Sequence, residues 1–292
     1  MYRKQAKSFG VRGMSAAERA AANPYLGRRV PLGGSTFVGE GDAVAGIDGG
    51  LRAFMHEVYA IMFIGLSITG LMAWLTYNLT VTADPAAAAT TADGLIYGIT
   101  ETAYLTPLGV MLWATPVSYA VCFGPLALLL FCGGAFRGLD TGAASGIFAV
   151  VAGLIGISFS GLAVTYTGAS ITSVFFTTAA AFAGLSLVGY TTKKDLSGWG
   201  SFLWMGFFGL LVAIIVNMVL KSDALQFAVC GVGVLVFAGF IAYDTQMIKE
   251  AYSGRMSGQE RRMLALNGAL DLYLDFVNLF RFLLFFLGSS EE

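Results

Sequence analysis

The carboxylates near the end of the chain are the residues whose types and spacing could do chemistry. Asp271 and Asp275 lie within residues 268–288, a segment otherwise dominated by Leu and Phe. On insertion scales, an Asp near the middle of a membrane helix costs about 3 kcal/mol, whereas each Leu or Phe contributes only about 0.5 kcal/mol. The segment is therefore apolar enough to enter a membrane but poorly stabilised by lipid alone. We expect it to be packed inside a helix bundle, with its carboxylates facing protein or water.

The polar residues of this segment follow helical spacing. At steps of four, four and three they are Asn267, Asp271, Asp275 and Asn278. These steps put them on one face of a helix, with Arg281 at its margin. We call Asn267, Asp271, Asp275 and Asn278 the polar stripe.

A further carboxylate, Asp244, lies near the end of the preceding apolar segment. The short connection that follows would make the two helices antiparallel neighbours, so Asp244 can face the polar stripe. Depth in the membrane, counted from the connection at about 1.5 Å per residue, matches Asp271 to Asp244 better than Asp275. Depth alone does not decide which of the two is the partner of Asp244.

Two carboxylates in a low-dielectric site cannot both stay ionised cheaply, so such a pair should hold a proton and sense pH. When deprotonated, it could also receive calcium transiently, because calcium prefers carboxylate oxygens. The alternative is structural: the Asp side chains form hydrogen bonds, cap backbone groups or pair with Arg281, and only hold the bundle together.

The composition indicates the elements that must position these groups. Hydrophobic residues make up 57% of the 292 residues and charged residues 12%, against about 25% charged residues in soluble domains. Seven apolar stretches are long enough to span a bilayer. They cover residues 54–76, 107–132, 145–166, 170–190, 202–220, 225–248 and 263–287. We therefore predict an all-α fold, a bundle of seven transmembrane helices.

Several functional classes are excluded by residue usage. His56 is the only histidine and the three cysteines form no Cys-x-x-Cys motif, which argues against zinc and haem sites. The sequence GISFSG at residues 156–161 lacks the spacing of a hydrolase nucleophile turn, and the last apolar stretch has no Lys for a retinal Schiff base. The net charge of −1 gives no indication of nucleic-acid binding. We expect no enzyme activity and no cofactor.

Basic residues predict the orientation in the membrane. The N-terminal tail and every second connection after it carry 15 Lys or Arg, whereas the remaining connections carry 1. Because basic residues favour the cytoplasmic side, this predicts a cytoplasmic N-terminus and a C-terminus outside. Residues 1–50 are expected to form a mobile basic cytoplasmic tail before a membrane domain at residues 51–288. The tail also resembles an organellar transit peptide, which leaves a mitochondrial inner membrane as the alternative to a bacterial one.

Three motifs resemble those of the Bax inhibitor-1 family, which includes the TMBIM and bacterial YccA-like proteins. They are GYTTKKDLS at 189–197, FIAYDTQMIKEAY at 240–252 and ALDLYLDFVNLFRFLL at 269–284. The resemblance covers about residues 51–288 and implies seven helices with the seventh surrounded by the other six.

The resemblance also implies a function. The family includes pH-sensitive calcium-leak proteins with paired aspartates on helices six and seven, and the motif match selects Asp244 and Asp275. Some leak members carry an Arg in the second helix that latches an aspartate, whereas residues 107–132 contain no Lys or Arg. The alternative function is that of YccA-like members, which resemble interaction proteins that modulate a membrane-bound AAA protease without transport.

Overall fold

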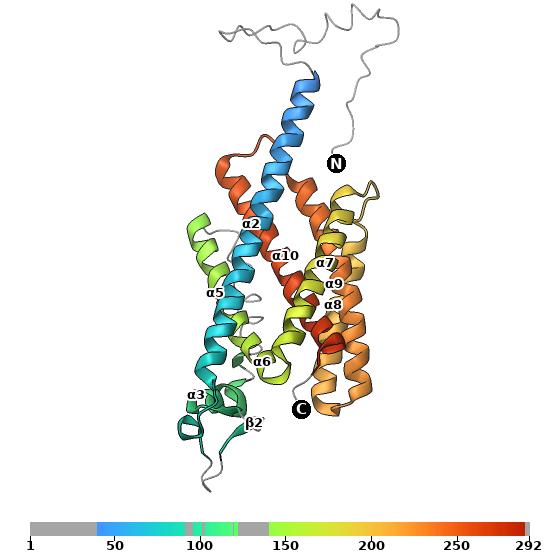
Figure 1. Ribbon diagram of the computed structural model, residues 1–292. Coiled ribbons are helices and arrows are strands. Elements are labelled where there is room, and N and C mark those ends of the chain that lie inside the picture. The colour runs from blue at the N-terminus through green and yellow to red at the C-terminus, as the bar shows by residue number, and fades with distance from the viewer. Residues whose placement is uncertain (1–39, 91–95, 101–102, 119, 122–139, 290–292) are drawn as a thin grey trace, which may run out of the picture. The chain divides into compact units, whose positions relative to one another are not determined.

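The computed structural model describes residues 40–90, 96–100, 103–118, 120–121 and 140–289. Its first helix, α2 (Glu40–Thr80), begins before the first predicted apolar stretch at residue 54. Contacts define a compact unit at Ile47–Glu292, which contains the remaining elements (Figure 1).

The polar segment after α2 contains a small antiparallel sheet, which the all-α prediction did not include. Its elements are β1 (Val81–Thr82), the 3₁₀ turn η1 (Pro85–Ala87), β2 (Gly98–Thr100) and β3 (Ala103–Leu105). The strand order is β1–β3–β2, and Val81 pairs with Leu105. β-branched and aromatic residues such as Val81, Ile99 and Tyr104 favour strands here. The short helical elements α3 (Pro107–Gly109) and η2 (Val110–Ala114) follow.

The rest of the described chain is helical. The elements are α5 (Thr141–Ser160), α6 (Leu162–Thr165), α7 (Gly168–Thr191), α8 (Trp199–Leu220), α9 (Asp223–Ala251) and α10 (Gly258–Leu287). Local signals mark several ends: the side chains of Thr167, Ser222 and Ser257 accept hydrogen bonds from the first turns of α7, α9 and α10. Lys221 takes a left-handed conformation (φ 49°) between α8 and α9, which allows a tight turn.

Five helical segments of the described chain are long and apolar enough to cross a membrane. They are Gly49–Thr80, Thr141–Thr165, Gly168–Thr191, Trp199–Leu220 and Asp223–Ala251. They coincide with five of the seven predicted stretches. Residues 119 and 122–132 of the second stretch lie outside the described residues, and α10, the helix at the seventh stretch, is not one of these five. The count of seven spans therefore stays a prediction.

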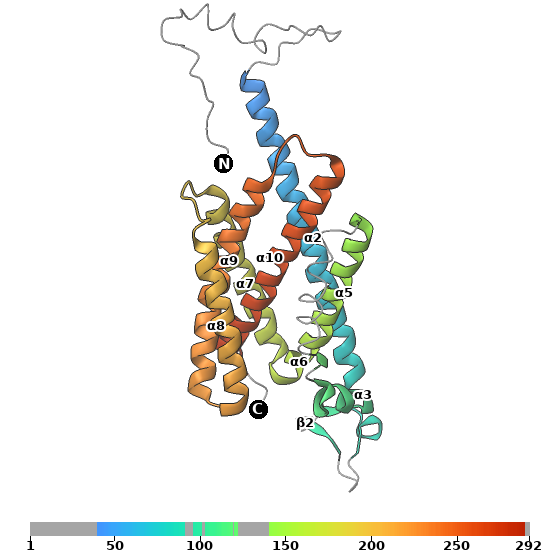
Figure 2. The ribbon, with the colours of Figure 1, turned by 180° about the vertical axis from the view of Figure 1, so that it is seen from behind.

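The helix α10 packs against α9, α7 and α5. Figures 1 and 2 show α10 running obliquely, with α2 and α5 on one side and α7, α8 and α9 on the other. Its Leu272 and Tyr273 side chains are fully buried. The Tyr273 hydroxyl makes a 2.6 Å hydrogen bond with Thr69 of α2, and Thr69 also donates to the Ala152 carbonyl of α5. The surroundings of α10 thus include protein on several sides, while its predicted enclosure by all six other helices stays a prediction.

Candidate functional site

The helices α9 and α10 bring two of the predicted carboxylates together. The side chains of Asp244 on α9 and Asp275 on α10 lie within hydrogen-bonding reach of each other. Two carboxyl groups can form such a bond only if one of them carries a proton, because two carboxylates offer only acceptors. A hydrogen bond between Asp244 and Asp275 would therefore hold a proton between two helices.

The environment of Asp275 supports the same conclusion. Its side chain is only 5% exposed. Within the part of the chain that the structure describes, no donor reaches the buried Oδ2 atom. A buried carboxylate oxygen without a donor is costly, and a proton shared with Asp244 reduces that cost. Asp244 is half-buried, so the pair lies at a boundary between protein interior and accessible surface.

The polar stripe does not stay on one buried face. Asn267 and Asp271 are exposed, Asn278 is half-buried and Asp275 is buried. A step of four residues turns a helix by about 40° beyond a full turn, so Asp275 is rotated away from Asn267 and into the contact with α9. Only Asp275 among these four meets Asp244 directly.

Asp271 is the nearest further charge. It lies one turn before Asp275, and its charge acts on both Asp244 and Asp275. Asp271 is exposed to solvent, although many protein atoms lie near its carboxyl group. The oblique course of α10 explains why depth along the helix favoured Asp271 as the partner: a tilted helix gains less depth per residue than one that runs upright.

The remaining polar residues of α10 have local roles. Asn278 donates from Nδ2 to the carbonyl oxygen of Leu274 at 2.8 Å, so its amide serves its own helix. Arg281 is exposed, and its charge acts on Tyr166 and Cys230 rather than on the aspartates. One form of the structural alternative, an ion pair between Arg281 and an Asp, finds no such contact among the described residues.

Residues next to Asp244 hold α9 in place, and the sequence reasoning did not single them out. Gln246 accepts from the Leu196 N–H at 2.7 Å and donates to the Lys194 carbonyl at 2.9 Å, which anchors the α7–α8 loop. Thr245 is fully buried and hydrogen-bonds to Ser186 of α7 at 3.0 Å. Polar residues directly beside Asp244 in an apolar helix were the available signal.

A chain of hydroxyls extends from this point to α2. Ser186 of α7 also hydrogen-bonds to the hydroxyl of Tyr59 on α2. Thr245 in turn donates to the Ile241 carbonyl at 2.7 Å, which leaves its oxygen to accept from Ser186. Three helices are thus joined beside Asp244, so the position of this carboxyl is set by polar contacts as well as by apolar packing.

Among the described residues, no group of three or more His, Cys, Asp or Glu side chains could hold a metal ion. The pair of Asp244 and Asp275 alone offers too few ligands for a stable calcium site, which takes six to eight oxygens. Cys230 is buried and free, as expected of a small apolar residue, whereas Cys122 and Cys132 lie outside the described residues.

The family model described as "Inhibitor of apoptosis-promoting Bax1" matches residues 51–292. The chain belongs to the Bax inhibitor-1 family. The match contains Asp244, Asp271 and Asp275 and leaves out the first 50 residues, so the carboxylate pair lies in the part of the chain that the family shares.

Bacterial relatives agree with this assignment. An uncharacterised protein of Caulobacter vibrioides is 43% identical over 248 residues, which cover 84% of this chain and 92% of that protein. The inner membrane protein YbhL of Escherichia coli is 36% identical over 253 residues, covering 86% of this chain and 97% of YbhL. An uncharacterised protein of Rickettsia prowazekii is 37% identical, with 84% and 93% covered. Family membership and the five apolar helices together identify a membrane protein.

Proposed function

We propose that this protein is a passive calcium leak whose opening is regulated by protons at Asp244 and Asp275. The observation that carries the proposal is the direct contact between these two carboxyl groups on neighbouring helices. A shared proton neutralises part of the charge and holds α9 against α10. Loss of that proton leaves two like charges in contact, which repel each other and attract a divalent cation.

The exposed part of the polar stripe gives a route to the pair. Asn267 and Asp271 are accessible on the side of the α9–α10 loop, and Asp271 lies one turn from Asp275. A cation that reaches Asp271 would next meet the pair. The small number of ligands suits a permeant ion, which must leave the site as readily as it enters.

Gating in this chain would depend on the pair itself. Some leak members of the family use an Arg in the second helix as a latch, but residues 107–132 contain no Lys or Arg. Arg281 lies near Tyr166 and Cys230 and does not replace such a latch. We therefore infer that the bond between the two carboxyl groups is the closed-state contact.

The test is calcium flux into liposomes containing the purified protein, measured from about pH 5 to about pH 8, a range in which coupled buried carboxyls titrate. Asp244→Asn and Asp275→Asn should each abolish the pH dependence, because the remaining carboxyl loses its titrating partner. The double variant should differ little from either single one, since coupled groups act as a unit.

Asp271→Asn is the matched control, because it removes a carboxylate one turn away without breaking the contact. It should keep a pH-dependent flux. An unchanged pH midpoint in both folded single variants would contradict the proton-sharing mechanism. A wild-type protein that gives no flux would contradict the leak itself and favour the interaction protein that modulates a membrane-bound AAA protease.

We also propose an inner-membrane location with seven spans, the N-terminus in the cytoplasm and the C-terminus outside. The name of the relative YbhL and the 15 to 1 distribution of basic residues support it. A reporter fused after Glu292 that is active only in the cytoplasm would overturn this orientation.

A further inference from the structure

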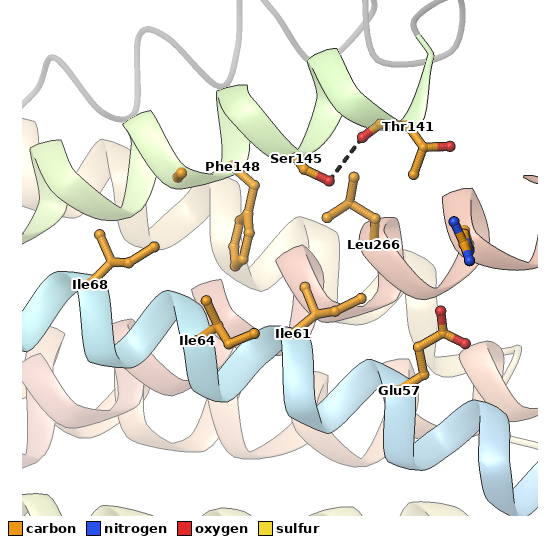
Figure 3. Close-up of a pocket in the computed structure, with 10 residues that line it drawn as sticks. Glu57, Ile61, Ile64, Ile68, Thr141, Ser145, Phe148 and Leu266 are labelled. Atoms are coloured by element: carbon orange, nitrogen blue, oxygen red, sulfur yellow. Dashed lines mark hydrogen bonds between the residues drawn. The ribbon is translucent and has the colours of Figure 1, made fainter.

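A cavity of about 290 Å³ lies between α2, α5 and α10, and neither Asp244 nor Asp275 lines it. Figure 3 shows that its two ends differ in chemistry. Along its length it is apolar, lined by Ile61, Ile64 and Ile68 of α2 and by Phe148 of α5. Glu57 and Thr141 lie at the end opposite Ile68. Arg262 also lines the cavity and follows Arg261, which forms an ion pair with Glu57. We call this cavity the α2–α5 trough.

The charges at the polar end leave one cation uncompensated. Glu57 forms an ion pair with Arg261, with 3.4 Å between Oε2 and Nη2. Arg262 lines the trough and is exposed, and within the described part of the chain no carboxylate pairs with it. Counting Glu57, Arg261 and Arg262, this end of the trough carries one net positive charge, beside the hydroxyl group of Thr141.

The length of the trough matches one leaflet of a membrane. From Glu57 to Ile68 the helix α2 advances eleven residues, or about 16 Å at 1.5 Å per residue. This is about half of the 30 Å hydrocarbon core of a bilayer. The Ile64 side chain is 56% exposed, so no described residue closes the apolar wall on that side.

We propose that the α2–α5 trough binds one acyl chain of an anionic phospholipid, whose phosphate contacts Arg262. An apolar groove of one leaflet's depth with a single cation at the interface is complementary to such a lipid in both shape and charge. The bound lipid would touch α2, α5 and α10 together. This site does not depend on calcium flux, so the failure of either proposal leaves the other standing.

The first test compares lipid retention by native mass spectrometry of the full chain in detergent, with phosphatidylglycerol or phosphatidylcholine added. The wild type should retain phosphatidylglycerol in preference. Arg262→Gln should reduce that preference about fivefold, the contribution of one basic residue near anionic lipid. Arg255→Gln, at an exposed arginine of the α9–α10 loop outside the trough, should leave it unchanged. Equal retention of both lipids, or equal losses in both variants, would overturn the proposal.

The second test fills the trough. Ala149 lines it, whereas the neighbouring Val150 is 55% exposed and does not. Ala149→Trp should abolish the retained phosphatidylglycerol and Val150→Trp should not. Equal retention in these two variants would overturn the acyl-chain site. A dimer that forms without lipid and is lost in Ala149→Trp would instead assign the trough to a second copy of the chain and overturn lipid binding there.

Discussion

The helices α8 and α10 lie in the same bundle but are stabilised by different surroundings. α8 has no charged residue among its 22, and its buried residues Gly200, Leu203, Leu210 and Asn217 follow a single seam against α9. α10 carries three charges in its apolar part, packs against α5, α7 and α9, hydrogen-bonds to α2 and buries Leu272 and Tyr273 completely. The exposed face of α8 is therefore suited to lipid, whereas α10 is stabilised mainly by its contacts with protein.

The largest expected difference between the two helices concerns apolar truncation. Leu272→Ala in α10 should lower the free energy of unfolding by about 3 kcal/mol, because it opens a cavity at a fully buried site. Ile215→Ala in α8 removes the same number of carbons at a side chain that is 61% exposed, and should cost less than about 0.5 kcal/mol. Unfolding by denaturing detergent in mixed micelles measures both. Equal losses would contradict the view that lipid, not protein, surrounds this face of α8.

A smaller effect is expected at Asn217, the buried polar contact of α8. Its side chain donates to Gln226 Oε1 at 2.8 Å and accepts from the Ser222 N–H at 3.0 Å. Asn217→Leu should cost about 1–2 kcal/mol, because it leaves both partners unsatisfied at the turn into α9. Met218→Leu, at the exposed neighbouring position, is the control and should be neutral. If Asn217→Leu were also neutral, water or lipid headgroups would have to replace its hydrogen bonds.

The contrast also explains which parts of the fold could be predicted from sequence. Apolar stretches predicted the helices α2, α5, α7, α8, α9 and α10, because long apolar runs are directly visible in the sequence. The β1–β3–β2 sheet was missed, since strands of two or three residues have no periodicity to detect. The early start of α2 at Glu40 was missed as well, because it precedes any apolar run.

Prediction of the site had a similar limit. Helical spacing identified the polar stripe, and antiparallel packing predicted that Asp244 would face it. The choice between Asp271 and Asp275 needed the resemblance, because the tilt of α10 cannot be read from residue counts. The anchoring roles of Gln246 and Thr245 depend on the loop at Lys194 and on Ser186 of α7, so they required the tertiary structure.

The smallest predicted effect distinguishes how the two helices begin. At α10, Ser257 Oγ accepts from the Glu260 N–H at 3.2 Å and Glu260 Oε2 accepts from the Ser257 N–H at 2.8 Å. At α8, Gly198 offers no side-chain cap. Ser257→Ala should therefore destabilise the first turn of α10 by about 1 kcal/mol at neutral pH. Hydrogen-exchange protection of the amides at 258–261 measures this change, with the amides at 199–202 of α8 as the internal control.

This cap should also depend on pH. The hydrogen bonds from Ser257 hold the pKa of Glu260 below its ordinary value of 4.5. A lowered pKa in the folded state means that the cap contributes fully above pH 4.5 and is lost as the pH falls through the lowered value. Glu260→Gln keeps an acceptor oxygen but cannot titrate, so protection at 258–261 should lose its acid sensitivity. A wild-type first turn that is equally protected on both sides of this range would show that Ser257 alone caps α10.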